Sequence, residues 1–318
     1  MKEKANQKDS DHYYYKVFGL TIKSELELPE LISISKFDKT DIEIQRGHIA
    51  GPPIKVDNPI EGKSSILYNS KHFYLDMGDI AKVSLTHEEN TVITTDLYQE
   101  ENANTMLAWI YGSVLTAALQ LNNRFALHAS AVAVDGALCL FCGRSGIGKS
   151  TLAAQLNLRG YPIFSDDKCV LIWDKENQQY LAEPSLQIIR LWEDATDKLG
   201  EQDFFTNPTP VVNKLNKYQY IVNDDKVIKE PTPISKIHVI ANLEEGGVLG
   251  MKEITGVRKI KILQTQTHRR NYVKGLGKTK VYWEFMDHLV KKVPVYLIMR
   301  PENTPISEFV DFVQKQID

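Results

Sequence analysis

Cysteine, long apolar runs and strong net charge are all scarce in this sequence. Three cysteines among 318 residues are too few for a disulfide scaffold. The longest largely apolar stretch, residues 106–121, is interrupted by Gly, Ser, Thr and Gln, which favours a buried helix over a membrane span. The net charge of −3 argues against a general nucleic-acid binder, because such proteins are usually basic. The first twelve residues are polar and lack the pattern of a signal peptide, so we expect a cytoplasmic protein.

Internal repeats and Gly/Pro/Ser-rich linkers are also missing, while apolar residues make up 42% of the chain, as in globular proteins. We expect residues 1–12 to form a disordered tail. Short alternating or β-branched runs separated by turn residues predict a β-rich N-terminal domain over residues 13–123. Its last element is a predicted helix near residues 102–122, where apolar side chains recur at helical spacing. Recognition of a substrate is the simplest role for this domain.

Residues 143–151 read Gly-Arg-Ser-Gly-Ile-Gly-Lys-Ser-Thr, a complete phosphate-binding loop of the form G-x-x-x-x-G-K-S. A short apolar run precedes it and a helical pattern follows it, as the motif requires. The glycines allow a sharp turn, and the N–H groups at the start of the helix attract an anion. The lysine reaches the β- and γ-phosphates of ATP, and the serine hydroxyl is a ligand for Mg²⁺. The predicted ATP-binding residues are Gly143, Ser145, Gly146, Ile147, Gly148, Lys149, Ser150 and Thr151.

Two adjacent carboxylates, Asp166 and Asp167, follow the loop after one predicted helix and one predicted strand. In a parallel sheet this connection returns the chain to the carboxyl end of a strand beside the loop. One carboxylate can hold Mg²⁺ there, and the other can accept a proton from an attacking hydroxyl. The alternative is a structural one, in which the pair starts a turn or caps a helix.

Other candidate residues also have common structural explanations. His128 opens a strand that leads toward the loop, and Arg190 follows an apolar strand-like run, yet a structural histidine and a surface arginine are common. Residues 252–280 are rich in Lys and Arg, and we consider both a solvated face and a loop that receives an anionic group or an acidic peptide. Cys139 and Cys142 form a C-x-x-C inside an apolar run without a second pair at zinc spacing, so a buried structural role is expected.

Three motifs then occur in a specific order, namely LHASAVAVDG at residues 127–136, GRSGIGKST at 143–151 and FSDDKCVL at 164–171. Together they resemble the HPr serine kinase family, whose catalytic core has the phosphoenolpyruvate-carboxykinase-like P-loop fold. The resemblance covers roughly residues 124–300. It implies an α/β protein in which an HPr-kinase-like P-loop core with a mixed central sheet, residues 124–318, follows the β-rich domain.

The resemblance also implies roles for individual residues. His128 matches a family histidine near the phosphates, and Asp166 matches the catalytic acid/base aspartate, with Asp167 as its partner near the metal. Arg190 matches the arginine of the family's E-V-R-G signature. The base and metal roles of the two aspartates can be exchanged.

Some positions depart from the bifunctional members of that family. Thr151 stands where a glutamate usually follows the loop serine, and Leu191 and Trp192 replace the residues that usually follow the signature arginine. These changes argue against the reverse phosphorylase activity and against HPr as the substrate. The segments FGLTIKSELELPEL, EPSLQIIRLW and VPVYLIMRP instead resemble a separate branch, which includes kinases encoded with lasso-peptide biosynthesis genes. Those kinases phosphorylate a serine of a precursor peptide.

We therefore expect an ATP- and Mg²⁺-dependent serine kinase that acts on a ribosomal precursor peptide of the lasso type. The expected catalytic residues are Asp166, His128, Lys149 and Arg190, and the expected metal ligands are Ser150 and Asp167. Two other classes stay open, a kinase for a free small molecule or another protein, and an ATP-binding regulatory protein without transfer activity. The expected partner is the peptide rather than a nucleic acid or a membrane, and a homo-oligomer remains open.

Overall fold

A computed structural model describes residues 11–54, 65–186, 188–192, 205–210, 217–222, 228–244 and 246–318. Its contacts divide the chain into two compact units. The first unit runs to Arg124 and also contains Arg269–Tyr282, and the second contains Phe125–His268 and Trp283–Asp318. A short segment of the predicted second domain therefore packs with the first unit. Residues 1–10 of the predicted tail lie outside the described residues.

The first unit is built on a mixed sheet, which has eight strands among the described residues in the order β3-β1-β2-β4-β8-β7-β6-β5. The β2–β4 and β4–β8 pairs are parallel and the others are antiparallel. Buried and half-buried residues alternate along β7 and β8, as expected for strands with one face in a core. The strands are β1 (Tyr13–Val17), β2 (Leu20–Ser24), β3 (Ile32–Ser33), β4 (Ile42–Arg46), β5 (Ser65–Tyr68), β6 (His72–Asp76), β7 (Ala81–His87) and β8 (Thr91–Leu97).

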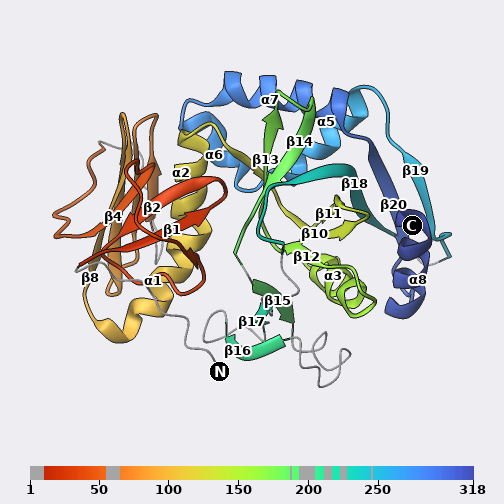
Figure 1. Ribbon diagram of the computed structural model, residues 1–318, viewed down its shortest axis with the longest axis horizontal. Helices are drawn as coiled ribbons and strands as arrows, with labels where there is room; N and C mark the ends of the chain where they lie inside the picture. Colours follow the sequence, from red (N-terminus) through yellow and green to blue (C-terminus); the bar gives the residue numbers. More distant parts are fainter. Residues whose placement is uncertain are drawn as a thin grey trace. The chain divides into compact units, whose positions relative to one another are not determined.

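A long helical segment follows this sheet, as the sequence predicts. It consists of η1 (Glu100–Asn102), α1 (Ala103–Trp109), a π-helical stretch η2 (Ile110–Val114) and α2 (Leu115–Leu121). Every residue of α2 is buried, and α2 contacts β7 and α6 (Arg270–Gly275). Figure 1 shows α1 and α2 running along the sheet in yellow. The predicted β-rich N-terminal region with a terminal helix is therefore confirmed.

The second unit has a mixed central sheet, which has nine strands among the described residues. Its order is β12-β10-β11-β18-β14-β13-β9, and β20 pairs with both β18 and β19. The β11–β18 and β18–β20 pairs are parallel, whereas β10 is antiparallel to both β11 and β12. The strands are β9 (Phe125–Leu127), β10 (Ala129–Val134), β11 (Ala137–Gly143), β12 (Ile163–Ser165), β13 (Cys169–Asp174), β14 (Gln179–Glu183), β18 (Thr232–Leu243), β19 (Gly250–Glu253) and β20 (Val295–Pro301).

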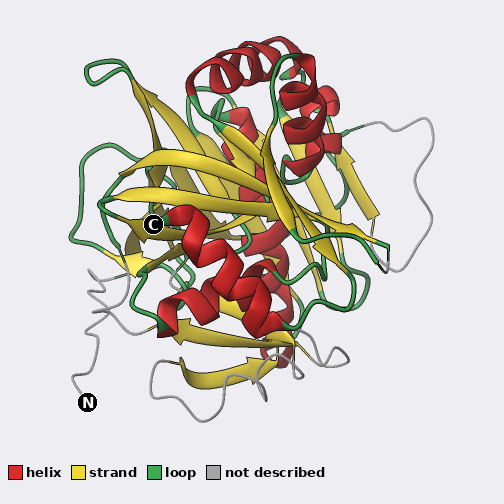
Figure 2. Ribbon diagram, turned by 90° about the vertical axis from the view of Figure 1, so that its right-hand side faces the viewer, coloured by secondary structure: helices red, strands yellow, loops and turns green. Residues whose placement is uncertain are grey.

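Helices cover both faces of this sheet (Figures 1 and 2). On one face α3 (Lys149–Leu158) and α8 (Ile306–Ile317) contact each other and pack on apolar side chains of β10, β11, β18 and β20. On the other side lie α5 (Val257–Leu263), η4 (Gln264–Gln266) and the second half of α7 (Thr279–Lys292), whose Phe285 packs on Phe125. A small sheet of β15 (Ile188–Trp192), β17 (Lys217–Val222) and β16 (Phe205–Pro210) completes the unit. The α/β fold with a mixed central sheet is confirmed.

The β-type patterns at residues 14–20 and 124–134 each predict a single strand, and both predictions are wrong. The run at residues 14–20 is two strands, because Phe18 and Gly19 both have positive φ and make a tight turn between β1 and β2. The run at residues 124–134 is also two strands, broken at His128, so that β9 pairs with β13 while β10 pairs with β11. The described part of the chain contains no helix of the length and apolarity that a membrane crossing needs.

Candidate functional site

The phosphate loop joins the end of β11 to the start of α3, as its motif predicts. Glycine is required at its two ends for different reasons. At Gly143, with φ of 151°, a Cβ atom would lie 2.9 Å from Cγ2 of Ile147 and 3.0 Å from the carbonyl oxygen of Ile240. Gly148 has φ of 97° and directly precedes the first residue of α3. The loop therefore wraps closely around the N-terminus of a ten-residue helix, where N–H groups attract anions.

The side chain of Lys149 lies inside this loop. It is buried, and its Nζ donates hydrogen bonds to the carbonyl oxygens of Gly143 at 2.9 Å and Arg144 at 3.2 Å. These contacts hold a positive charge in the bend of the loop. Phosphate oxygens that enter the loop meet this ammonium group together with the backbone N–H groups.

Asp166 is a buried carboxylate that ties three elements together. Its Oδ1 accepts hydrogen bonds from the hydroxyls of Ser130 at 2.6 Å and Ser150 at 2.9 Å. Its Oδ2 accepts the backbone N–H of Arg190 at 2.9 Å. Ser130 lies on β10, Ser150 in the first turn of α3, and Arg190 on β15. Asp166 is thus fixed against the loop serine by donors on both oxygens.

Asp167 has a different environment, although it is the next residue. Its side chain is 28% exposed, and it lies 3.6 Å from Nε2 of His128 and 3.4 Å from Nη1 of Arg190. Burial alone would raise the pKa of Asp167, but the positive charges of His268, Arg190, Lys168 and His128 outweigh it and hold that pKa well below its usual range. Its φ of 77° is strained for a residue with a side chain, which is common at functional sites.

Two histidines border Asp167. The rings of His128 and His268 meet edge to face with centroids 5.9 Å apart. The backbone N–H of His128 donates to the carbonyl of Gln266 at 2.7 Å, and that of His268 donates to the carbonyl of Ala126 at 2.9 Å. An isolated bridge joins Leu127 to Thr267 between them. The end of η4 is therefore fastened to β9 beside the site.

The structure brings together most of the predicted site residues, namely Lys149, Ser150, Asp166, Asp167, His128 and Arg190. Arg190 contacts Asp166 through its backbone and Asp167 through its guanidinium group. Ser145 and Gly146 are exposed in the loop, Ile147 is buried beneath it, and Thr151 is half-buried on α3. The basic residues 252–280 are mostly helical rather than a loop, since they form α5, η4, α6 and the start of α7.

The neighbour of the loop strand differs from the prediction. The prediction put the aspartates beside the loop strand, but β10 lies between β12 and β11. Because β10 is antiparallel to both neighbours, the carboxyl ends of β12 and β11 still reach the same edge of the sheet. The start of β10 is at that edge too, and it supplies Ser130, which sequence reasoning missed. Its only signal was its place two residues after His128 in the motif LHASAVAV.

Arg300 is a second residue that the prediction did not include. It lies near the end of β20, and a Cβ atom at Gly148 would lie 3.4 Å from its Nη1, so the guanidinium group borders the phosphate loop. Its Nη2 donates to the carbonyl of Thr304 at 2.9 Å, and its planar group lies over the ring of Phe309 at 4.6 Å. Burial lowers the pKa of Arg300, but an arginine stays charged at physiological pH. The loop therefore has a second cation close to it.

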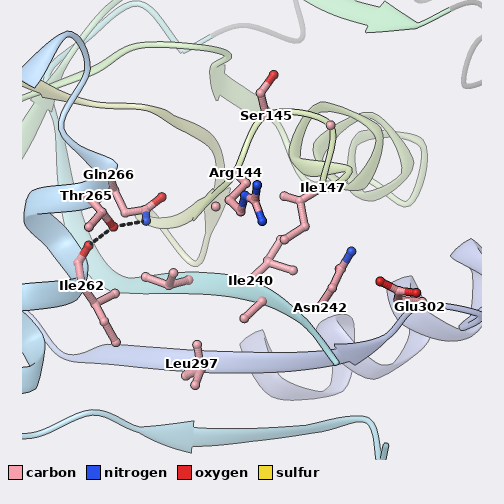
Figure 3. Close-up of a pocket in the computed structure, with 14 residues that line it drawn as sticks. Arg144, Ser145, Ile147, Ile240, Asn242, Ile262, Thr265, Gln266, Leu297 and Glu302 are labelled. Atoms are coloured by element: carbon pink, nitrogen blue, oxygen red, sulfur yellow. Dashed lines mark hydrogen bonds between the residues drawn. The ribbon is translucent and has the colours of Figure 1, made fainter. Parts of the chain in front are cut away.

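A cavity of about 640 Å³ opens on the other flank of the loop (Figure 3). Its lining includes Gly143 to Ile147 of the loop, Val239 to Asn242 of β18 and Leu297 of β20. Ile262, Thr265 and Gln266 form one side of the cavity, and Asn242 and Glu302 lie at the opposite side. Aliphatic side chains such as Ile147, Ile240 and Leu297 form part of the lining, and Arg144, Asn242, Gln266 and Glu302 add polar or charged groups.

The residues beside the loop fit a magnesium ion. A serine hydroxyl and a carboxylate oxygen lie within hydrogen-bonding distance of each other at Ser150 and Asp166. Mg²⁺ prefers such oxygen ligands, and it is usually held by one or two carboxylates together with waters and substrate phosphates. The contact involves Asp166, whereas the prediction named Asp167 as the metal ligand.

The three cysteines of the chain have structural positions in the core. Cys139, Cys142 and Cys169 are all free and buried. Cys139 and Cys142 are three residues apart on β11, so their side chains point to opposite faces of the sheet. Burial raises the pKa of the Cys169 thiol to about 12, which keeps it protonated and unreactive.

Comparisons with known proteins add little to this geometry. No protein-family model matches the sequence, and no curated protein matches it. Among solved structures, the HPr(Ser) kinase/phosphatase from Coxiella burnetii is similar, with 15% sequence identity over 60% of this chain and 89% of that chain. The TM-score of this match is 0.32. Because a likeness of this size does not establish a function, the function has to be inferred from the site.

Proposed function

We propose that this protein is an ATP-dependent kinase that transfers the γ-phosphate to a hydroxyl group. One observation carries the proposal. The loop serine, Ser150, bonds to one carboxylate, Asp166, while the adjacent carboxylate, Asp167, is partly exposed among cationic side chains. A phosphate loop alone supports binding, but transfer also needs a metal ligand and a group that orients the acceptor. The two aspartates can supply these two functions.

Asp166 and Ser150 would hold Mg²⁺ in this scheme. The ion would neutralise charge on the β- and γ-phosphates. Asp166 suits this role better than proton transfer, because it is buried and already accepts three hydrogen bonds. We therefore exchange the roles that the sequence resemblance implied, so that Asp166 is the metal ligand and Asp167 the acid/base.

Asp167 would orient the acceptor hydroxyl and take its proton. The acceptor oxygen forms a bond to the γ-phosphorus, the bond from that phosphorus to the bridging oxygen of ADP breaks, and the proton passes to the carboxylate. The low pKa of Asp167 keeps it ionised and ready to accept a hydrogen bond. Lys149, His128 and Arg190 place positive charge near the transferring group, where electrostatic stabilisation is most effective.

We further propose a seryl hydroxyl of a lasso-type precursor peptide as the acceptor. This proposal is supported by the sequence motifs that resemble that branch of kinases, and by Thr151 and Leu191, which depart from the enzymes that act on HPr. A free small molecule or another protein remains the competing acceptor. The site geometry fits each of them, because Asp167 requires only a hydroxyl group.

The test uses ATP labelled at the γ-phosphate. The wild-type protein is incubated with Mg²⁺ and the precursor peptide, the same peptide with its serine changed to alanine, or free serine. We expect label on the unaltered peptide alone, and none with Asp167→Asn protein. Label on free serine would replace the peptide acceptor with a small molecule. ATP binding without any labelled product would instead support a regulatory nucleotide-binding protein.

A further inference from the structure

A second histidine, His268, lies at the site, but the proposed mechanism gives it no role. Its ring meets the ring of His128 edge to face, with centroids 5.9 Å apart. Nε2 of His128 in turn lies 3.6 Å from Oδ1 of Asp167. All three residues belong to the second unit, and each is half-buried. The three side chains therefore form one cluster around the proposed acid/base.

The backbone holds His268 at this place. Its N–H donates to the carbonyl of Ala126 on β9 at 2.9 Å, and the N–H of His128 donates to the carbonyl of Gln266 at 2.7 Å. A backbone bridge joins the residues between these two bonds. The two histidines are thus brought together by strand-like pairing, which fixes their register more firmly than a loop without such bonds.

Backbone strain also marks the cluster. Arg269, the residue after His268, has φ of 50°, and Asp167 has φ of 77°. A left-handed conformation costs a residue with a side chain on the order of 1–3 kcal/mol and persists where the surrounding contacts impose it. Such strain is concentrated at functional sites. Both strained residues are at or next to the His268–Asp167 pair.

Electrostatics links His268 to Asp167 directly. Burial raises the pKa of Asp167, and nearby positive charges outweigh that effect. Among these charges the ring of His268 has the largest effect, ahead of Arg190 and Lys168. Arg190 and His128 contact the two different oxygens of the carboxylate. His268 therefore adds a further cationic group to a carboxylate that is already bordered at both oxygens.

From this arrangement we infer that His268 is a positioning residue for Asp167. The inference rests on the proposed function, in which Asp167 orients the acceptor hydroxyl. His268 supports the ring of His128 and borders the carboxylate, so that the carboxylate stays directed at the acceptor. In this scheme His268 contacts neither ATP nor the acceptor. Its removal slows transfer without weakening ATP binding, because a small displacement of a positioned group strongly lowers the rate.

The first test measures the interaction itself and requires no activity. Protein labelled with ¹⁵N in its eight histidines gives ring signals in nuclear magnetic resonance spectra. The signals of His268, assigned by their loss in His268→Phe protein, are compared between wild-type and Asp167→Asn protein. Asp96→Asn is the matched control, because Oδ2 of Asp96 lies 3.1 Å from Nδ1 of His48, outside the site.

We expect the His268 ring signals to shift in Asp167→Asn protein and to keep their positions in Asp96→Asn protein, which should shift those of His48. Unchanged His268 signals in Asp167→Asn protein would overturn the inference, whatever reaction the protein catalyses. Equal shifts of His268 in both variants would overturn it too, because the change would not depend on the neighbouring carboxylate.

The second test determines whether His268 acts through Asp167. Transfer from labelled ATP to the precursor peptide is measured for wild-type, His268→Phe, Asp167→Asn and the double variant. Phenylalanine keeps a ring against His128 but has no N–H group. His48→Phe is the control, because it removes a histidine that also lies beside an aspartate but is 83% exposed.

We expect His268→Phe to lower kcat about tenfold and to leave the KM for ATP within about twofold of wild type. In the Asp167→Asn background the same change should alter kcat by less than about twofold, because the group it positions is already lost. The His48→Phe control should behave as wild type.

Three results would overturn the positioning role while the proposed function stands. These are a wild-type kcat in His268→Phe protein, an effect on the KM for ATP alone, and the same tenfold loss of kcat with and without Asp167. A wild-type protein that transfers no phosphate would instead overturn the proposed function, and the positioning role with it, even if the spectra show the interaction.

Discussion

The two flanks of the phosphate loop differ in their side chains and in how these are held. On one flank, side chains are charged, close together and fixed by hydrogen bonds, as Asp166 shows with its three donors. On the other flank, aliphatic side chains of β18 and β20 line an open cavity, and in the described part of the chain no ion pair joins its charged residues, Arg144 and Glu302. The difference follows from the sheet, because antiparallel β10 brings Ser130 and His128 to one flank, while parallel β18 and β20 leave open carboxyl ends on the other. A single edge of the sheet thereby carries two different surfaces.

Neutralising Asp167 should have the largest effect on the reaction. In Asp167→Asn protein the carboxylate that would orient the acceptor is lost, so we expect kcat to fall about 10³-fold. ATP should still bind with an affinity within a few-fold of wild type, because the phosphate loop is unchanged. Steady-state rates of peptide phosphorylation and calorimetric titration of ATP measure the two effects. A variant that keeps near wild-type kcat would remove Asp167 from the reaction.

The sheet under the cavity should lose stability at acidic pH. His238 of β18 is fully buried between Phe141 and Tyr296, and burial, with a smaller contribution from Lys236, lowers its pKa from 6.5 to about 4. The unfolded chain therefore binds a proton that the folded chain does not as the pH falls from 6.5 toward 4. The contribution of neutral His238 to the free energy of unfolding is fully present above pH 6.5 and is lost as the pH falls from 6.5 to about 4. At pH 5 we expect a loss of about 2 kcal/mol.

Urea unfolding at pH 7.5 and pH 5 measures this loss. A His238→Phe variant is the comparison, since it keeps an aromatic ring between the same neighbours but cannot take up a proton. Its free energy of unfolding should change less between the two pH values by about 2 kcal/mol. If the wild-type protein and the variant lose equal stability, another group is responsible. A fall in the phosphorylation rate below pH 6.5 can also come from this loss of stability. It should therefore be measured in the His238→Phe variant before it is attributed to Asp166 or Asp167.

A smaller effect is expected from Ser130. Its hydroxyl donates to Asp166 at 2.6 Å and so orients the proposed metal ligand. Loss of such a supporting group typically costs about 10- to 100-fold in metal affinity. In Ser130→Ala protein, the Mg²⁺ concentration for half-maximal rate should therefore rise at least about tenfold.

Ser235→Ala is the matched control, because that hydroxyl bonds to the carbonyl of Leu138 near the other end of the sheet. It should leave the Mg²⁺ requirement unchanged. An equal Mg²⁺ requirement in Ser130→Ala and wild-type protein would show that Asp166 does not depend on this contact. A rise in both variants would point to a general effect on the sheet rather than on the site.

The parts of the site that the sequence predicted are those whose geometry is local. The phosphate loop follows from glycine positions within six residues. The turn between β10 and β11 is equally local, because its sequence Asp135-Gly136 is a common hairpin signal and both residues adopt positive φ. The position of Asp166 at the loop was also predicted, although an intervening strand was not. The helix that connects β11 to β12 predicts that the two strands run in the same direction. Which strand lies between them depends on contacts between segments that are distant in the sequence.

Other features depend wholly on such distant contacts. His268 reaches the site because residues 266–268 bond to β9, more than a hundred residues earlier, and no local pattern encodes that register. Arg300 borders the loop because β20 pairs with β18. The sequence also could not predict that the adjacent residues Asp166 and Asp167 have different environments. Their difference arises from Ser130, Arg190 and His128, which lie on separate strands or at their ends.

In the proposed mechanism Asp166 is a ligand of the metal ion, and Asp167 orients the acceptor hydroxyl. The most direct measurement is the electron paramagnetic resonance of Mn²⁺, used in place of Mg²⁺, with ADP and each of two variants. Binding of Mn²⁺ should be weakened about tenfold or more in Asp166→Asn protein and stay close to wild type in Asp167→Asn protein. Retained binding in Asp166→Asn together with loss in Asp167→Asn would contradict the assignment.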